Sequence, residues 1–265
     1  MNLLVFAGTT EGTDFTQKAL SAGHTVTVSV ATDYGADVLK ANLSSSPELT
    51  AIREKKLHIL HGRLSAEEIA SLAVPFDAIV DATHPFAEEV TKNLLAASRT
   101  ASVPYFRLLR PPVSVRYEKL REFKTIPELT HALCDTTGNV FLSTGSRDLD
   151  AFAAIPNYTE RLFVRVLPSA ESIEKCRAIG FAQSHIIAMQ GAFSVELNKS
   201  LFSEYHCRIL VTKESGSAGG FAEKIAAAQA LDMEVFALLP PQEPKLGIRT
   251  FSTAEDMLSA LSGVK

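Results

Sequence analysis

A turn with two glycines follows the first apolar run of the chain. Residues 3–7 are typical of a buried strand, and Gly8-Thr9-Thr10-Glu11-Gly12 comes directly after them. Glycines let a backbone approach a pyrophosphate, and the N-terminus of a following helix offers unpaired N–H groups. The Gly-x3-Gly spacing is not the full dinucleotide-binding fingerprint, so a tight turn without a ligand is the alternative. We predict a phosphate-binding turn, in which Thr9 and Thr10 add hydroxyl donors.

Two polar residues, Thr32 and Asp33, stand just past the second expected strand, residues 25–31. Asp33 lies 21 residues after Gly12, where a dinucleotide fold places the group that binds a ribose. A carboxylate favours an unphosphorylated ribose, whereas Thr32 could serve a 2′-phosphate. The sequence leaves this choice open.

The segment Asp81-Ala82-Thr83-His84-Pro85 follows the fourth expected strand, residues 78–81. It falls at the carboxyl edge of the predicted sheet, beside the switch point where open α/β sheets bind ligands. Polar groups crowded into an otherwise apolar turn favour a functional interpretation. In the alternative, Asp81 and Thr83 cap a helix and His84 is exposed.

A basic segment spans residues 105–124. It contains six basic residues against two acidic ones, a local charge of +4 in a chain of net charge −4. Arginine binds carboxylates through two parallel hydrogen bonds, so Arg107 and Arg110 are candidates for holding an anionic ligand. A solvated, charged linker is the alternative.

Three turns in the second half of the chain also follow expected strands: residues 143–147, 189–194 and 212–220. Each is expected to place small residues and hydroxyls at a helix N-terminus, an arrangement that accepts anions. Lys213 could add a point charge for a carboxylate. The candidate residues in these turns are Thr144, Gly145, Ser146, Gln190, Gly191, Lys213, Ser215 and Gly216.

The elements that must position these turns alternate between short apolar runs and amphipathic helices, which predicts parallel sheets covered by helices. Five strands are expected within residues 1–112, and their number favours a complete domain. Prolines at 111 and 112 interrupt the pattern, and a second run of strands and helices covers residues 123–241. The predicted fold class is therefore α/β: two Rossmann-like domains with parallel sheets and a cleft between them.

The C-terminal segment, residues 242–265, is expected to hold a helix over residues 254–261 that packs on either domain. Residues 251–261 echo residues 123–133 in their pattern of Phe, Thr, acidic residues and Leu. The echo is explained either by two similar halves or by two unrelated capped helices.

Composition excludes several classes of protein. No apolar run approaches the roughly 20 residues that span a bilayer, and a net charge of −4 argues against a nucleic-acid partner. The three cysteines have no metal-ligand spacing, and the pair His58 and His61 lacks a third ligand nearby, so no metal site is predicted. Free cysteines indicate a reducing, cytoplasmic setting.

Five segments, taken together in this order, resemble one family: residues 8–12, 81–87, 144–146, 191–194 and 210–216. They resemble the precorrin-6A reductases, including the cobalt-precorrin-6A reductases, of cobalamin biosynthesis. The resemblance covers essentially the whole chain, and the segments 81–87 and 210–216 are its most specific parts.

The resemblance implies reduction of one carbon–carbon double bond in (cobalt-)precorrin-6A to give (cobalt-)precorrin-6B, with NADPH or NADH as the cofactor. The partner is then a small tetrapyrrole, a corrin precursor whose many carboxylates suit the anion-accepting turns. Cofactor-binding residues would be Gly8, Thr9, Thr10, Glu11, Gly12, Thr32, Asp33, Asp81, Ala82, Thr83 and Pro85. Substrate-binding residues would be Arg107, Arg110, Thr144, Gly145, Ser146, Gln190, Gly191, Lys213, Ser215 and Gly216.

A proton for the carbon beside the reduced position would come from water or from a side chain, with His84 as the candidate. Two other functions compete: an NAD(P)-binding protein without turnover, and a cofactor-free, two-lobed enzyme that modifies a tetrapyrrole. The metal content of the substrate and the oligomeric state stay open.

Overall fold

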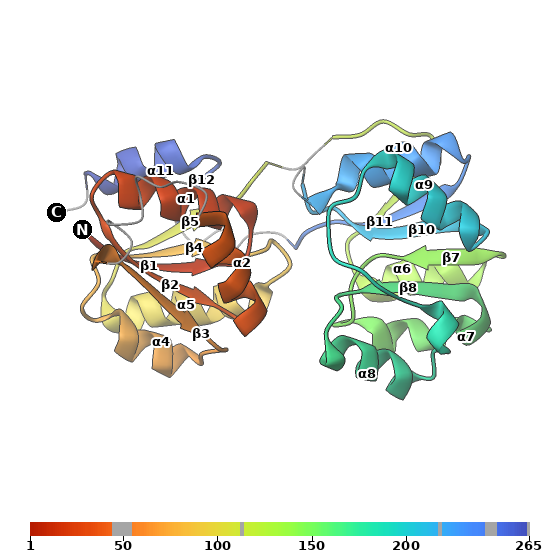
Figure 1. The fold of residues 1–265 in the computed structure, drawn as a ribbon, viewed down its shortest axis with the longest axis horizontal. Helices are drawn as coiled ribbons and strands as arrows, with labels where there is room; N and C mark the ends of the chain where they lie inside the picture. Colours follow the sequence, from red (N-terminus) through yellow and green to blue (C-terminus); the bar gives the residue numbers. More distant parts are fainter. Residues whose placement is uncertain (44–54, 112–113, 217–218, 242–247, 264–265) are drawn as a thin grey trace. The chain divides into compact units, whose positions relative to one another are not determined.

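The computed structural model describes residues 1–43, 55–111, 114–216, 219–241 and 248–263. The chain forms two compact units, the first containing Met1–Pro111 with Gln242–Lys265 and the second Pro112–Pro241. In the described residues each unit is built on one six-stranded sheet (Figure 1). The recorded strand pairs are parallel in both sheets. The predicted α/β fold with two Rossmann-like sheets is confirmed.

The first unit places its strands in the order β12-β5-β4-β1-β2-β3. The strands are β1 (Asn2–Ala7), β2 (Thr25–Val30), β3 (Leu57–His61), β4 (Ala78–Ala82), β5 (Tyr105–Leu108) and β12 (Arg249–Phe251). The helices are α1 (Thr10–Ser21), α2 (Asp33–Leu43), α4 (Ala66–Ala73), α5 (Glu88–Ala101) and α11 (Ala254–Leu261). The chain order reverses between β1 and β4, which is the switch point of this sheet.

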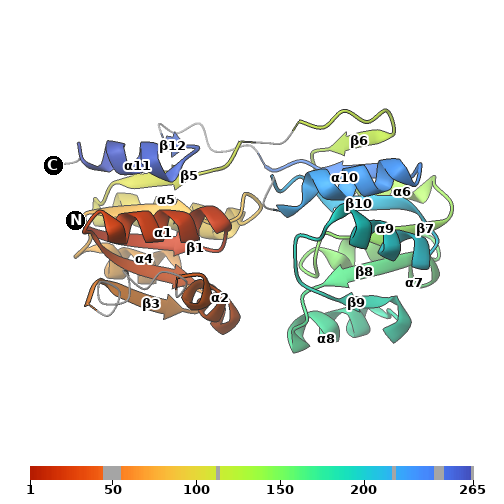
Figure 2. The ribbon, with the colours of Figure 1, turned by 45° about the horizontal axis from the view of Figure 1, so that its top comes forward.

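Burial on both faces of the first sheet explains why its central strand β1 is a continuous apolar run. Leu3 and Val5 of β1 lie in a core with residues of α1, α2 and α11. Leu4 and Phe6 point the other way, into a core with α4 and α5. Figure 2 shows α1 and α11 side by side over this sheet.

The second unit has the order β6-β11-β10-β7-β8-β9. Its strands are β6 (Leu120–Phe123), β7 (Asn139–Leu142), β8 (Leu162–Val166), β9 (Ile186–Ala188), β10 (Cys207–Lys213) and β11 (Glu234–Leu238). Its helices are α6 (Ile126–Cys134), α7 (Tyr158–Arg161), α8 (Ala170–Ile179), α9 (Val195–Glu204) and α10 (Phe221–Ala230), with 3₁₀ helices η2 (Leu149–Ala154) and η3 (Gln183–His185). The switch point of this sheet lies between β7 and β10.

The two sheets exchange their edge elements. The β6–α6 segment follows β5 in the chain but pairs with β11, whereas β12–α11 follows β11 but pairs with β5. These two segments contain the sequence echo. Thr125 and Thr253 cap α6 and α11 in the same way, each accepting a hydrogen bond from the backbone three residues on. The echoing segments thus occupy equivalent positions in two similar units.

The structure differs from the expected first domain in one respect. Five strands do not complete the first sheet, because the sixth, β12, comes from the C-terminal segment. Both exchanged strands are short and mostly exposed or half-buried, so they lack the apolar pattern by which strands are recognised. Of the helices in the described ranges, none combines the length and hydropathy needed to cross a membrane.

Candidate active site at the carboxyl edges of the two sheets

The glycine turn of the first unit is tighter than expected. Helix α1 begins at Thr10, within the turn itself, because Thr9 caps it by accepting a hydrogen bond from the Gly12 N–H. A Cβ on Gly12 would lie 3.0 Å from the Ala7 Cβ and 3.2 Å from the Ala82 Cβ. Gly12 therefore lets α1 pack closely on the ends of β1 and β4, the packing role of a dinucleotide-fold glycine.

Gly8 lies on the open side of the same turn. It is exposed, and a Cβ there would meet no atom within 4 Å. Thr10 is also exposed, at the first position of the 12-residue helix. Room for an anion beside the backbone N–H groups of α1 is what a pyrophosphate requires. These residues therefore fit a dinucleotide.

The Thr9 hydroxyl is used within the fold. It donates to the Ala82 carbonyl over 2.9 Å, while it accepts from Gly12. This bond links the turn after β1 to the turn after β4 across the switch point. Thr9 therefore positions the two turns, and the donors left for a phosphate are the backbone N–H groups and Thr10.

Glu11 and Arg110 form an ion pair at 3.2 Å. Glu11 lies in the first turn of α1, where its charge suits the helix dipole but would repel a phosphate. Arg110, just past β5, offsets that charge. Arg110 was expected to contact a substrate, and the structure places it beside the predicted cofactor turn.

Asp81 and Arg107 are the centre of a buried network at the end of β4. Asp81 is 0% exposed and Arg107 1% exposed. Asp81 Oδ1 accepts from Arg107 Nη1 at 2.7 Å and from both the N–H and the hydroxyl of Thr83. Asp81 Oδ2 accepts from the hydroxyls of Thr91 and Tyr105, each at 2.8 Å.

This network holds the turn rather than offering groups to a ligand. Arg107 also donates to the Thr83 carbonyl at 3.1 Å, so both sides of the turn are anchored. Neither Asp81 nor Arg107 has exposed surface for a direct contact, in contrast to the expectation from sequence. We assign both to positioning the segment that carries His84 and Pro85.

His84 and Pro85 are half-buried beyond this anchor. His84 Nδ1 accepts from the Phe86 N–H at 3.2 Å, which fixes the ring, and the two rings lie 5.7 Å apart. With Nδ1 accepting, a neutral His84 carries its proton on Nε2. Its proposed proton transfer stays a prediction.

At the end of β2, Thr32 is exposed and accepts from the Gly35 N–H at 3.1 Å, so it caps α2. Asp33 is the first residue of α2, and its side chain lies outside the described part of the structure. Since β2 pairs with β1, this position is beside the glycine turn, as a ribose site requires.

In the second unit the turn after β7 carries Thr144, Gly145 and Ser146. Thr144 is buried and its hydroxyl has no hydrogen-bond partner among the described residues, whereas the Ser146 hydroxyl lies 3.2 Å from that of Ser172. Gly145 has a φ of +80° and open space at its Cβ position. The element that follows is the 3₁₀ helix η2 and not the expected α-helix. This turn therefore lacks the strong dipole of an α-helix N-terminus.

The turn after β10 is packed and internally paired. Lys213 donates to Asp148 at 2.9 Å, which joins the turns after β10 and β7. Glu214 accepts from the Gly216 N–H at 2.9 Å, and Ser215 is buried. A Cβ on Gly219 would fall on the Ser215 side chain. Lys213 is thus already neutralised, whereas it was expected to be available to a carboxylate.

Of the three turns described for the second unit, after β7, β9 and β10, the turn after β9 is exposed. Gln190 and Gly191 are exposed, and Gly191 has a φ of +144°. A Cβ on Gly191 would lie 2.8 Å from the Phe193 ring, so glycine allows the ring to fold back on the turn. Ser194 caps α9 by accepting from the Leu197 N–H.

Comparison with known proteins decides the family. The family model for "Precorrin-6x reductase CbiJ/CobK" matches residues 2–262. The chain belongs to this family. It is 33% identical over 264 residues to a cobalt-precorrin-6A reductase of Priestia megaterium, covering 98% of this chain and 97% of the relative. A cobalt-precorrin-6A reductase of Methanothermobacter thermautotrophicus is also 33% identical, with 97% of this chain and 82% of the relative covered.

A solved structure of CobK precorrin-6A reductase shares the fold, with a TM-score of 0.78 and 22% identity. The alignment covers 100% of this chain and 98% of that one. As a member of the reductase family, the chain is an oxidoreductase of cobalamin biosynthesis that uses a nicotinamide-type reductant.

Sequence reasoning missed two cations at the carboxyl edge of the second sheet of this reductase. Lys224 on α10 is 4% exposed, and burial together with the charge of Arg165 lowers its pKa to about 7, against an opposing effect of Glu223. Burial also lowers the pKa of Arg165, on β8. The sequence contains a pattern that indicates burial of Lys224, because Lys224 falls on the apolar helix face that contains Phe221, Ile225 and Ala228.

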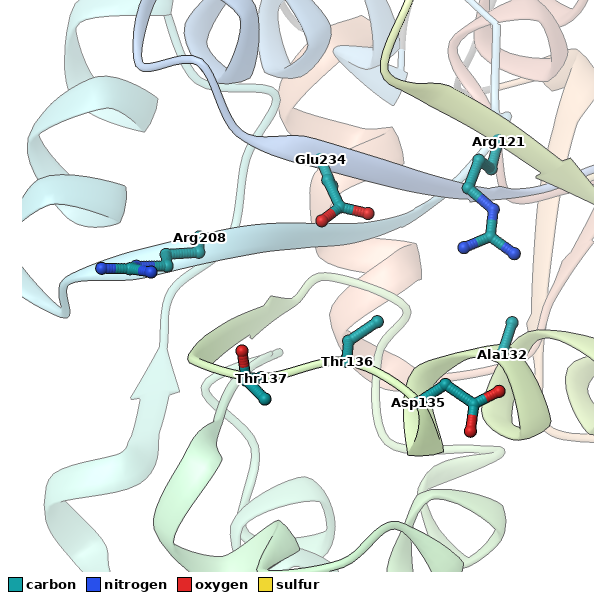
Figure 3. Close-up of a pocket in the computed structure, with 7 residues that line it drawn as sticks. All are labelled: Arg121, Ala132, Asp135, Thr136, Thr137, Arg208 and Glu234. Carbon is teal, nitrogen blue, oxygen red and sulfur yellow. The ribbon is translucent and has the colours of Figure 1, made fainter.

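A polar pocket of about 380 Å³ lies elsewhere in the second unit (Figure 3). Its lining includes Arg208 and Glu234, near the starts of β10 and β11, and Thr136 and Thr137, just before β7. It is therefore at the amino edge of the sheet, opposite to the turns described above. Open α/β sheets bind ligands at the carboxyl edge, so we do not assign this pocket to the reductase reaction.

Proposed function

We propose that this protein reduces one carbon–carbon double bond of (cobalt-)precorrin-6A, giving (cobalt-)precorrin-6B, with NADPH or NADH. The observation that carries the proposal is the family match over residues 2–262, joined to a glycine turn that leaves the N-terminus of α1 accessible at Gly8. The relatives named for this reaction are similar along nearly the whole chain.

The first unit is proposed to bind the nucleotide, because α1 begins directly at the switch point between β1 and β4. The backbone N–H groups of Thr10 and Glu11, with Gly8 leaving room, would hold the pyrophosphate. Thr32 and Asp33 would contact the ribose at the end of β2. The nicotinamide would supply the hydride when bound.

The turn anchored by Asp81 is proposed to shape the nicotinamide pocket. Its contribution is rigidity, since a group fixed by a buried ion pair needs little reorganisation when a substrate arrives. Within that turn, His84 is the candidate for delivering the proton to the carbon beside the reduced position, with water as the alternative.

The second unit is proposed to bind the macrocycle through its carboxyl edge. A corrin precursor carries acetate and propionate groups, which suit the exposed turn at Gln190 and the buried hydroxyl of Thr144. Its conjugated ring system is itself an electron acceptor, so positioning matters more than a protein nucleophile. We place the reaction in the cytoplasm, and the free thiols of Cys134, Cys176 and Cys207 support this setting.

The test is anaerobic turnover with metal-free and cobalt-loaded precorrin-6A, each with NADPH and NADH, followed by loss of reduced-nicotinamide absorbance. Oxidation that depends on the macrocycle is the expected result, and the four combinations identify the preferred metal state and cofactor. Nucleotide binding without oxidation in any combination would favour a binding protein. No nucleotide binding at all would favour the cofactor-free enzyme.

A further inference from the structure

Two cations of the second unit, the buried Lys224 and the half-buried Arg165, form no ion pair with a described residue. Lys224, in the first turn of α10, is 4% exposed and forms no hydrogen bond or ion pair with a described residue. The Nη1 atom of Arg165 is buried and has no hydrogen-bond partner among the described residues. A buried charge without a partner is strongly unfavourable, so a buried lysine beside a guanidinium with a buried, unbonded nitrogen needs an explanation.

The two side chains come together on one face of the sheet. Phe163, two residues before Arg165 on β8, packs in the core under α9 and α10. Because alternate residues of a strand share a face, Arg165 points to the same side. Arg165 is close enough for its charge to lower the pKa of Lys224. The charge of Glu223 raises the pKa of Lys224 and so opposes Arg165. The Oε2 atom of Glu223 is itself buried and has no hydrogen-bond partner among the described residues.

This cluster of Arg165, Glu223 and Lys224 lies at the carboxyl edge of the sheet. Arg165 is the last but one residue of β8, and its guanidinium stacks over the Phe193 ring at 5.1 Å. A Cβ on Gly220, the residue before α10, would lie 3.1 Å from the Ala192 Cβ. The start of α10 therefore packs against the exposed turn of residues 190–194, and the cluster lies beneath that turn.

The start of α10 adds to the positive potential. Its N-cap is Gly220, and no side chain accepts from the first-turn N–H groups. Those groups, the guanidinium and the Lys224 amine together form a set of donors, whose net charge is +1 when Lys224 is protonated and Glu223 is ionised. An anion that supplies acceptors to both cations would remove the unfavourable burial.

We propose that Arg165 and Lys224 together bind one carboxylate of the macrocyclic substrate. This inference rests on the proposed function for its ligand. The guanidinium of Arg165 donates to one or both oxygens of this carboxylate, and stacking on Phe193 fixes the guanidinium plane. Lys224 supplies a point charge from α10. The group bound is a flexible acid side chain at the edge of the macrocycle, so the site anchors the substrate and takes no part in hydride or proton transfer.

The test uses Arg165→Gln and Lys224→Met in the full chain. Each variant is expected to raise the Kd for the macrocycle, measured by its absorbance change, about 10- to 100-fold, the loss of a charged hydrogen bond. The Kd for the nicotinamide nucleotide is expected to stay at the wild-type value. Arg208→Gln, at the amino edge of the same sheet, is the matched control and is expected to bind the macrocycle normally.

Stability separates this role from a structural one. If the cations stabilised the fold, either substitution would lower the resistance to denaturant, whereas the anchor leaves it unchanged or raised. Lys224→Gln is the second variant if Lys224→Met does not fold. An unchanged Kd for the macrocycle in folded variants of both positions would overturn the proposal.

A double-mutant cycle can combine a change in the protein, Arg165→Gln, with a change in the ligand, esterification of the macrocycle's carboxylates. Esterification is expected to weaken binding less in Arg165→Gln than in the wild type, because the variant has already lost the charge contact. An equal loss in both proteins would overturn the anchor. Binding titrations do not require turnover, so wild-type protein that binds the macrocycle without oxidising NADPH or NADH would reject the proposed function and leave the anchor standing.

Discussion

The two sheets share one strand order, yet their switch points are built differently. In the first unit an α-helix begins directly after β1, and the buried charges Asp81 and Arg107 are paired with each other. In the second unit a 3₁₀ helix follows β7, and the half-buried Arg165 and the buried Lys224 form no ion pair with a described residue. Topology therefore sets where a ligand binds in each unit, whereas the local pairing of charges decides which kind of ligand the site suits.

The first unit is thus suited to an anion held by backbone N–H groups, with its side chains satisfied internally. The second unit leaves side-chain donors for an anion that must come from outside. A nucleotide phosphate suits the first arrangement and a substrate carboxylate the second. Five tests probe this contrast, starting with the largest expected effect.

Removing one partner of the buried ion pair in the first unit should have the largest effect on stability. Asp81→Ala removes the carboxylate from the buried Arg107 guanidinium, and the loss is expected to be about 3–5 kcal/mol. Hydrogen exchange of the β4 and β5 amides measures it, because two units need not unfold together. Protection equal to that of the wild type would mean that the network does not hold this edge.

His84→Ala tests the proton transfer assigned to the first unit. If His84 is the donor, kcat should fall about 100-fold or more while the Kd for the nucleotide is kept. The measurement is single-turnover oxidation of the reduced nicotinamide with saturating macrocycle. Turnover close to that of the wild type removes the role from His84 and assigns the proton to water.

Gly12→Ala and Gly8→Ala form a matched pair in the glycine turn. The new Cβ at position 12 would press on Ala7 and Ala82, at 3.0 and 3.2 Å, so a loss of about 1–3 kcal/mol in stability is expected. The Cβ at position 8 meets nothing within 4 Å, so Gly8→Ala should fold normally. Both variants should bind the nucleotide more weakly by titration, and normal binding by Gly8→Ala would place the phosphate elsewhere.

Lys224→Met should stabilise the second unit in a pH-dependent way. The pKa of Lys224 is about 7 in the folded state, below the ordinary lysine value of 10.5, so the unfolded chain binds the proton more tightly. The destabilisation is therefore complete below pH 7 and fades as the pH rises toward the unfolded pKa. The variant should gain on the order of 1–3 kcal/mol near pH 6 and less near pH 9. Denaturant unfolding at the two pH values checks the sign.

The smallest effect is expected from the exchanged edge elements, where the two units are most alike. Thr125→Ala and Thr253→Ala each remove a side-chain cap, from α6 and α11, at about 1 kcal/mol apiece. Equal local losses, read by hydrogen exchange in each helix, would support the equivalence of the two segments. A loss at only one of them would contradict it.

The sequence alone determined the α/β class and most of the strands. The run of residues 3–7 is apolar on both faces because parallel strands are buried on both sides, and that pattern is local. The capping box of α4, formed by Ser65 and Glu68, is likewise local, since it joins residues only three apart. The family resemblance, carried by five segments, is confirmed by the family match.

Tertiary structure decided the partners of the charged residues and the edges of the sheets. Arg107 meets Asp81 across 26 residues, and Lys213 meets Asp148 across 65, so residues that looked available for a ligand are already paired. Lys224 and Arg165 come together only because α10 packs on the face of the second sheet toward which Arg165 of β8 points. The place of β12 beside β5 likewise depends on pairing between distant segments, which has no local pattern to reveal it. Local sequence specifies which element forms, whereas the free energy of burying a charge depends on neighbours that the fold alone brings together.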